Sequence, residues 1–195
     1  MLDAEISQRS AWLSADIRNG QRVIVVAPRA VGSHQAWQTH PVRISQANTG
    51  DVAGLARLLW LDTHNEEPAQ RSVDAFAAEL AQWWAARQDS HLAFVARLVR
   101  PEIVGMAWVA LVPRVPRPGA ASRLSADIQS VFVMPKQRGQ GIGSALVEAA
   151  SEHATRLGSL RVTVQSGRKA VPVYERLGFE SSRQLLQRMA SRGMV

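Results

Sequence analysis

Apolar residues recur along this chain with two different spacings, and these spacings predict its secondary structure. Three segments repeat apolar residues three or four positions apart, as helices with one buried face do: residues 48–61, 72–87 and 142–157. Asn48 or Thr49 can cap the first of them. Runs rich in β-branched and aromatic residues predict strands: residues 42–46, 92–99, 103–112, 131–133 and 160–164. This mixture predicts an α/β (α+β) fold around one sheet.

The first 40 residues carry a weaker pattern than the rest. Residues 4–17 have helical spacing, residues 22–27 predict a strand that joins the edge of the sheet, and the residues after them predict no element. We therefore divide the chain into an N-terminal extension, residues 1–40, and a main domain, residues 41–195. Within the main domain, the proline-rich residues 113–119 predict a loop.

A glycine-rich turn joins the strand at residues 131–133 to the helix at 142–157. The first N–H groups of a helix lack partners, and the helix dipole adds positive charge there. Gly139, Gly141 and Gly143 would let the backbone approach a pyrophosphate closely. Because Arg138 adds a guanidinium, the turn predicts a site for an anionic cofactor. A purely structural strand-to-helix turn is the alternative.

The spacing of these glycines distinguishes this turn from the two common nucleotide-binding motifs. A dinucleotide fingerprint needs G-x-G-x-x-G and a later acidic residue, but here the third glycine comes one residue early and the next strand ends in Gln165 and Ser166. A Walker loop needs a lysine after its glycines, and none follows. The pattern that remains is R-x-x-G-x-G, and with it the chain resembles the GNAT superfamily of acyl-CoA-dependent N-acetyltransferases.

A second motif strengthens the resemblance. Residues 170–179 match the A-x-x-x-Y-x-x-x-G-F signature that follows the next strand of this family. The resemblance covers most of the chain and implies the GNAT fold, a central mixed, mostly antiparallel twisted sheet with helices on both faces. It also implies a splayed strand pair that binds CoA. Residues 113–119 and the first two helices would then lie near the acceptor groove.

The resemblance also implies where acetyl-CoA, the co-substrate, would bind. Backbone groups of Val131, Phe132 and Val133 would bond the pantetheine arm. The pyrophosphate would lie on the loop and the start of the helix: Arg138, Gly139, Gln140, Gly141, Ile142, Gly143 and Ser144. Gly167 stands where relatives often carry an asparagine that bonds the cofactor, so one side-chain hydrogen bond is missing here.

The sequence offers one candidate for the general acid and several for the general base. Tyr174 matches the tyrosine that acts as general acid on the departing CoA thiolate, and a phenol is protonated at neutral pH. Relatives often use a glutamate as base where this chain has Gln129, which cannot take a proton. Asp127 would share a strand face with Gln129 and is the candidate base. Three further carboxylates follow the first helix: Asp62, Glu66 and Glu67.

Composition and charge narrow the range of partners that we expect the protein to bind. The chain has no cysteine, a hydrophobic fraction of 46% and no apolar run long enough to cross a bilayer, so we expect a cytoplasmic protein without disulfides. The net charge is +7, with ten basic against four acidic residues in residues 134–195. This basic half suits CoA phosphates, and because it lacks interleaved aromatic residues we expect no nucleic acid. No metal-ligand spacing stands out, and His153 is expected to pack in the core.

These observations predict an N-acetyltransferase that transfers the acetyl group of acetyl-CoA to a primary amine by direct attack in a ternary complex. The acceptor is a small molecule or a peptide or protein. A non-catalytic acyl-CoA-binding regulatory module is the alternative, motivated by Gln129 and Gly167. The pattern leaves a monomer and a homodimer open.

Overall fold

The structure is a computed structural model of the chain, and it describes residues 13–18, 21–26, 42–98 and 102–188. Two compact units divide the chain, Met1–Gln165 and Ser166–Val195. The first unit contains the sheet and helices α1 to α3, and the second contains the short helix α4 (Val171–Arg176).

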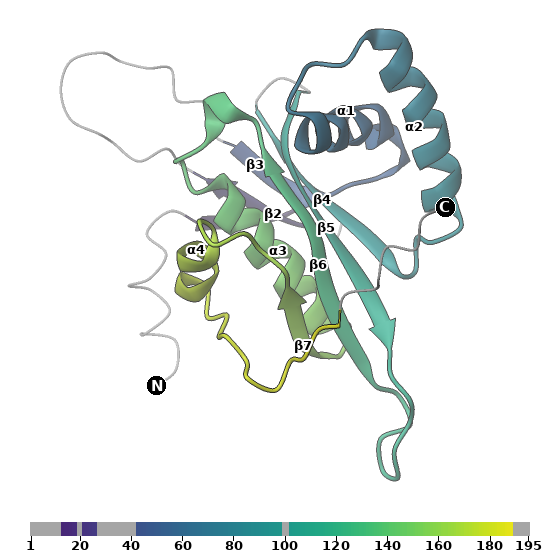
Figure 1. Cartoon of the computed structure of the whole chain (residues 1–195), viewed down its shortest axis with the longest axis vertical. Coiled ribbons are helices and arrows are strands. Elements are labelled where there is room, and N and C mark those ends of the chain that lie inside the picture. The colour runs from purple at the N-terminus through teal and green to yellow at the C-terminus, as the bar shows by residue number, and fades with distance from the viewer. Residues whose placement is uncertain (1–12, 19–20, 27–41, 99–101, 189–195) are drawn as a thin grey trace, which may run out of the picture. The chain divides into compact units, whose positions relative to one another are not determined.

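Within the described residues of the first unit, seven strands form one sheet whose spatial order is the order of the chain (Figure 1). The strands are β1 (Leu13–Arg18), β2 (Gln21–Val26), β3 (Val42–Gln46), β4 (His91–Arg97), β5 (Ile103–Pro113), β6 (Leu124–Val133) and β7 (Ser159–Val164). All neighbours are antiparallel except β6 and β7, which are parallel. The expected mixed, mostly antiparallel sheet is confirmed.

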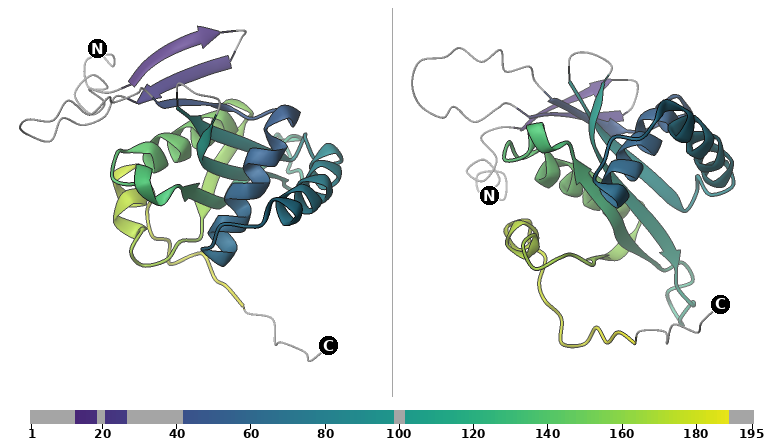
Figure 2. Two further views of the ribbon diagram at one scale, coloured as in Figure 1. Left: turned by 90° about the horizontal axis from the view of Figure 1, so that it is seen from above. Right: turned by 45° about the horizontal axis from the view of Figure 1, so that its top comes forward.

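Helices cover both faces of this sheet. Helices α1 (Val52–His64) and α2 (Gln70–Ala85) lie on one face, and α3 (Ile142–Arg156) lies on the other (Figure 2). The first face closes over a buried cluster that includes Leu55, Leu58, Trp84, Met106 and Trp108. The three helices predicted in the main domain are confirmed. Of two adjacent tryptophans of α2, only one is in the core: Trp84 is 5% exposed, whereas Trp83 is 38% exposed.

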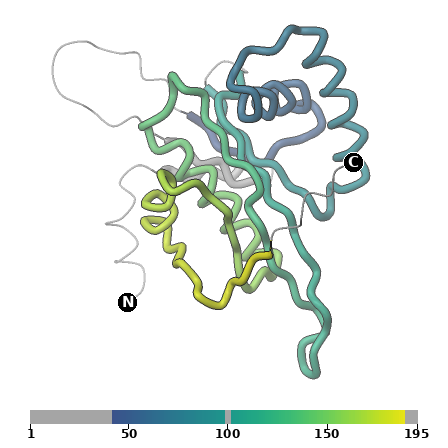
Figure 3. Tube along the Cα trace, in the orientation of Figure 1, coloured from purple at the N-terminus to yellow at the C-terminus, as the bar shows by residue number. Residues whose placement is uncertain are grey.

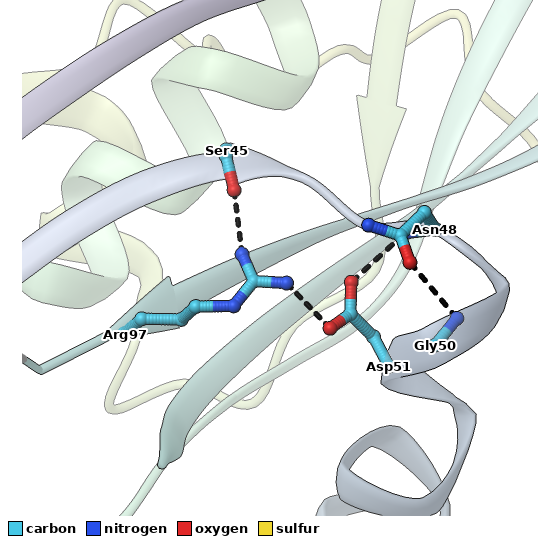
Figure 4. Close-up of polar contacts among 5 residues, drawn as sticks. All are labelled: Ser45, Asn48, Gly50, Asp51 and Arg97. Atoms are coloured by element: carbon cyan, nitrogen blue, oxygen red, sulfur yellow. Dashed lines mark hydrogen bonds and ion pairs between the residues drawn. The ribbon is translucent and has the colours of Figure 1, made fainter. Parts of the chain in front are cut away.

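A polar junction fixes the chain where β3 turns into α1 (Figure 4). Asn48 and Asp51 form a capping box, in which Asn48 Oδ1 accepts from the Gly50 N–H at 2.8 Å and Asp51 accepts from the Asn48 N–H at 2.9 Å. Arg97 of β4 pairs with the Asp51 carboxylate and donates to Ser45 Oγ at 2.6 Å. The expected cap at Asn48 is therefore present, but it caps the turn of 3-10 helix η2 (Thr49–Asp51) that leads into α1, and an ion pair ties this turn to the sheet.

Asp51→Ala should lower the free energy of unfolding by about 2–3 kcal/mol, because it removes a cap and leaves Arg97, whose side chain is only 24% exposed, without its carboxylate partner. Glu67→Ala is a matched control, since it breaks an ion pair with Arg57 in which the Glu67 side chain is 58% exposed. The control should cost less than about 1 kcal/mol. Urea unfolding of both variants measures the difference, and equal losses would contradict this account of the junction.

The N-terminal segment differs from its prediction. Residues 13–17, expected to be helical, belong to β1, which pairs with β2 in a continuous antiparallel register. Asn19-Gly20 stands between these strands in the sequence and is a strong hairpin signal that the helical reading overlooked. The predicted strand at 22–27 is confirmed as β2, which adds to β3. Residues 4–12 of the predicted helix lie outside the described residues.

The proline-rich segment is the tip of the hairpin formed by β5 and β6. Pairing continues past the strands through Arg114 N–H to Arg123 O at 2.9 Å and through a bridge between Arg117 and Ala120. Gly119 closes the turn with a φ of 78°. The tube in Figure 3 shows this hairpin extending beyond the rest of the sheet. The expected loop is thus a short, partly paired extension of two long strands.

Candidate active site

Strand β6 loses its neighbour β7 partway along its length. The last parallel pair joins Ile128 to Val164, where β7 ends, whereas β6 stays paired with β5 as far as Val133. Beyond Ile128, one edge of β6 therefore has no strand partner among the residues that the structure describes. This is the splayed strand pair that the resemblance implies.

Alternation along β6 decides which backbone groups reach the open edge. The Met134 N–H donates to Val104 O at 2.8 Å, so the residues on either side of Phe132 direct their N–H and C=O groups away from β5. These residues are Val131 and Val133. Phe132 was also predicted to bind the cofactor, but its backbone faces β5 and its side chain, 7% exposed, belongs to the core. Two of the three predicted residues thus present backbone groups at the open edge.

The glycine loop follows a turn of 3-10 helix, η3 (Pro135–Gln137). Gly139 and Gly141 have φ angles of 78° and 81°, in the left-handed region that a side chain disfavours. A Cβ added to either residue would meet no atom within 4 Å. The glycines are therefore required by the backbone conformation, and the space outside the loop is open.

Helix α3 begins directly after this loop. Its first internal bond joins the Ala145 N–H to Gly141 O at 3.0 Å, and no side chain caps it. The N–H groups of Ile142, Gly143 and Ser144 consequently lack an intrahelical partner. The Ile142 side chain is buried in the core, so only the backbone N–H of Ile142 can bind a ligand. This arrangement suits the oxygens of a pyrophosphate.

Arg138 and Gln140 are both exposed on the loop. The Arg138 guanidinium lies 5.5 Å from the centre of the Phe132 ring, and its Nε donates to Val133 O at 2.9 Å. The Arg138 side chain therefore lies at the junction of the open β6 edge and the loop. Its remaining N–H groups can serve an anion there.

A pocket of about 460 Å³ opens between α1, α2 and the sheet. Most of its wall is apolar: Leu59, Phe76, Leu80, Trp83 and Trp108. Glu79, Gln129 and Ser130 supply the polar groups. The lining contains residues of both of the first two helices and none of the proline-rich segment, so the expected place of residues 113–119 at the acceptor groove stays a prediction.

A β-bulge brings the polar end of this pocket to the open edge of β6. Trp108 pairs with Ser130 whereas Val109 pairs with Ile128, so Gln129 is the extra residue. Gln129 and Ser130 are the first residues of β6 beyond its last pair with β7. The pocket and the splayed edge therefore meet at the bulge.

Two carboxylates hydrogen-bond to groups of this region. Asp62 of α1 accepts from Ser130 Oγ at 3.0 Å, and Asp127 accepts from Thr163 Oγ1 at 3.0 Å. Asp127 lies in the stretch of β6 that still pairs with β7, whereas Ser130 lies beyond it. Asp62 is thus the carboxylate tied to the bulge. Sequence reasoning could not find this contact, because 68 positions separate its two residues.

The other polar residues at the end of α1 and just after it have different surroundings. Glu67 accepts two hydrogen bonds from Arg57, at 2.6 and 3.1 Å. His64 stacks on Trp60 with ring centres 4.6 Å apart, and Glu66 is exposed. In the described part of the chain, no group of three or more acidic, histidine or cysteine side chains could hold a metal ion.

His153 lies on α3 with its ring 5.5 Å from that of Phe94. Burial, and secondarily the charge of Arg156, lowers the pKa of His153 from its usual value, so the neutral ring is favoured at pH 7. These surroundings agree with the expected packing role. Among the described residues, no helix combines the length and apolar character needed to span a membrane.

Tyr174 lies on α4 in the second unit. Its half-buried ring meets that of Phe179 edge to face, with centres 5.5 Å apart. Burial raises the pKa of the Tyr174 phenol above its usual value of about 10. The hydroxyl therefore keeps its proton throughout the neutral range, as a general acid must.

The chain belongs to the acetyltransferase (GNAT) family, because residues 52–179 match the sequence model of that family. The match runs from the start of α1 to Phe179 and includes the loop, the bulge and Tyr174. It confirms the class of acyltransferase and the fold that the two sequence motifs predict. The family uses acetyl-CoA.

Two curated relatives are N-acetyltransferases. The glucosamine 6-phosphate N-acetyltransferase of Trypanosoma brucei brucei is 37% identical over 79 residues, which cover 40% of this chain and 52% of the relative. An uncharacterised N-acetyltransferase of Methanocaldococcus jannaschii is 30% identical over 126 residues, which cover 57% of this chain and 52% of the relative. The chain thus spans about half the length of the curated relatives it matches.

Solved structures share the fold. A Trypanosoma brucei acetyltransferase has a TM-score of 0.61 at 24% identity, covering 76% of this chain and 99% of the other. A transcriptional regulator of Bacillus halodurans has a TM-score of 0.60 at 27% identity, with the same coverage. An acetyltransferase of Clostridium acetobutylicum, solved with acetyl-CoA, has a TM-score of 0.58 at 18% identity, covering 76% and 96%.

Proposed function

We propose that the protein is an N-acetyltransferase that transfers the acetyl group of acetyl-CoA to a primary amine. The observation that carries this proposal is the continuity of three features along residues 128–144: the open edge of β6, the left-handed glycine loop and the uncapped start of α3. Each offers backbone donors or acceptors that a plain strand-to-helix turn does not require. Family membership supports the same reaction.

In this proposal the loop holds the cofactor by its phosphates. The N–H groups at the start of α3 and the Arg138 guanidinium bind the pyrophosphate, where the helix dipole adds to their charge. The Val131 and Val133 backbone groups bond the amides of the pantetheine arm along the open edge. This arrangement orients the thioester toward the bulge at Gln129, where the pocket begins.

Acetyl transfer then needs the amine nitrogen to lose protons and the sulfur to gain one. A carboxylate takes the first proton from the ammonium form, and the neutral nitrogen attacks the carbonyl carbon to form a new C–N bond. Collapse of the adduct breaks the C–S bond as Tyr174 donates its phenolic proton to the departing thiolate, and the proton that the adduct nitrogen loses returns to the phenolate. The chain has no cysteine, so the acetyl group passes to the amine without a cysteine-linked intermediate.

Asp127 and Asp62 are the two candidates for this base, and their positions favour Asp62. The Asp62 carboxylate bonds Ser130 Oγ at the pocket, whereas Asp127 bonds Thr163 in the paired part of the sheet. A proton can pass from the amine through a water or the Ser130 hydroxyl to Asp62.

Asp62→Asn should therefore lower kcat about 100-fold near pH 7, within the range for loss of a general base, and the loss should shrink as the pH rises and the amine deprotonates in solution. Asp127→Asn is the matched control and should change kcat less than about threefold. Initial rates of CoA release between pH 6.5 and 9.5 measure both variants. A large loss in Asp127→Asn with an unchanged Asp62→Asn would assign the base to Asp127.

A second candidate function is a non-catalytic acyl-CoA-binding module. The likeness to the Bacillus halodurans transcriptional regulator and the glutamine at position 129 favour it. Turnover separates the two functions. The purified chain is incubated with acetyl-CoA and a panel of primary amines, and free CoA thiol is measured. Amine-dependent thiol release supports the transferase, whereas binding of acetyl-CoA without release for any amine would support the module.

A further inference from the structure

We infer that the pocket beside the β6 bulge binds the acceptor as a primary amine carried on an apolar, preferably aromatic, body. This inference rests on the proposed acetyl transfer and names its substrate class. It concerns the pocket lined by α1, α2 and the bulge, whose volume of about 460 Å³ lies in the range of small-molecule sites.

The wall of the pocket suits an apolar body. Phe76, Trp83 and Trp108 contribute aromatic faces and edges, and the Trp83 and Trp108 rings meet at 6.2 Å with planes 69° apart. Trp83 is part of this wall and is 38% exposed even though the Arg87 guanidinium lies 5.0 Å from the centre of its ring, so an aromatic ligand would cover surface that the fold still leaves in water. Aromatic pairs of this kind add to the gain from burial.

The charges of the pocket suit an ammonium group. The lining includes the Glu79 carboxylate and no lysine or arginine, and Asp62 bonds Ser130 at the polar end. A phosphate or carboxylate on the acceptor would therefore have no cationic partner among the lining residues and would meet negative charge. The site is thus unlike one for a sugar phosphate, the acceptor named for the Trypanosoma brucei brucei relative.

The polar end of the pocket lies where it would direct the amine of the acceptor toward the cofactor. Gln129 and Ser130 line the pocket and are also the first residues of β6 past its last pair with β7. An amine whose apolar body fills the aromatic part would hold its nitrogen next to these two residues. The nitrogen then lies where the pantetheine edge begins, as attack on a thioester requires.

The test compares acceptors at saturating acetyl-CoA by the rate of CoA release. We expect kcat/KM for phenethylamine to exceed that for ethanolamine and for glucosamine 6-phosphate by about 100-fold, the factor that burial of one aromatic ring supplies. Trp83→Ala should lower the phenethylamine to ethanolamine ratio about tenfold, and this ratio does not depend on the folded fraction of the preparation. Equal or higher kcat/KM for glucosamine 6-phosphate, ethanolamine or a lysine peptide would overturn the inference.

Glu79→Gln tests the charge of the pocket and should raise KM for phenethylamine about fivefold, with KM for acetyl-CoA unchanged. Asp74→Asn, on the same helix and outside the pocket lining, removes one charge as a matched control and should leave both values unchanged. Equal effects in the two variants would contradict a direct role of Glu79.

A binding measurement keeps this inference separate from the proposed function. If no amine releases CoA, the proposed transferase activity is wrong. Saturation-transfer NMR of phenethylamine with CoA present then tests whether the pocket still binds an aromatic amine. A signal in the wild-type protein that disappears in Trp83→Ala would still assign the pocket to an aromatic amine. No signal, or the same signal in both proteins, would overturn the assignment.

Discussion

Gly141→Asp should abolish acetyl-CoA binding at micromolar concentrations while the protein stays folded. Gly141 has a φ of 81°, faces open space and precedes the uncapped start of α3. The new carboxylate would stand where the pyrophosphate is proposed to lie. At an effective dielectric constant of 20, two unit charges 4 Å apart repel by about 4 kcal/mol. After screening by solvent, we expect the Kd to rise at least about 100-fold, measured by isothermal titration calorimetry.

Gly119→Asp is a matched control for this variant. Gly119 also has a positive φ, 78°, and also faces open space, but it lies at the tip of the β5–β6 hairpin. Both variants carry a similar cost of a side chain in the left-handed region, about 1 kcal/mol. The control should bind acetyl-CoA like the wild type. Wild-type affinity in Gly141→Asp would remove the loop from the cofactor site.

Tyr174→Phe should lower kcat by about 100-fold and leave the Kd for acetyl-CoA unchanged within about twofold, because it removes only the phenolic hydroxyl that supplies the acidic proton. The phenylalanine ring can keep the edge-to-face contact with Phe179. Single-turnover measurements with saturating acetyl-CoA isolate the chemical step. A wild-type rate in the variant would return Tyr174 to a packing role.

The pH profile separates an acid from a packing residue. Because burial raises the pKa of Tyr174, this proposed general acid stays protonated at neutral pH, and its proton is lost only as the pH rises above about 10. The wild-type rate should therefore fall at strongly alkaline pH through loss of this proton, and the fall should be absent from the Tyr174→Phe profile. The same alkaline fall in both proteins would contradict the assignment.

The elements of the proposed cofactor site could be predicted from local sequence. The stripe of Ile142, Leu146 and Ala150 identified α3, and all three side chains are buried. The glycines of the loop occupy backbone conformations in which Gly139 and Gly141 have positive φ, as the motif requires. Local periodicity succeeds here because helix, turn and packing face depend on neighbours a few positions apart.

The acceptor side could not be predicted, because it depends on contacts between distant segments. The bulge at Gln129 arises from the register of β6 against β5, and the Asp62 to Ser130 bond joins residues 68 positions apart. Trp83 and Trp84 are neighbouring tryptophans on one helix, yet only the Trp84 indole N–H points to the sheet, where it donates to His91 O at 2.7 Å. Sequence spacing alone cannot tell which of two adjacent tryptophans is buried, so the pocket could be identified only from the three-dimensional structure.

Selective binding of CoA species tests the central claim most directly. The thermal midpoint of the purified chain is measured with acetyl-CoA, CoA, NAD or ATP, each at a hundredfold excess over a plausible Kd. At that excess, binding to the native state adds about 2.7 kcal/mol, which raises the midpoint of a domain of this size by about 5–10 °C. We predict this rise with acetyl-CoA and CoA alone. No rise with either, or an equal rise with NAD and ATP, would contradict the assignment of the β6 edge and glycine loop as an acetyl-CoA site.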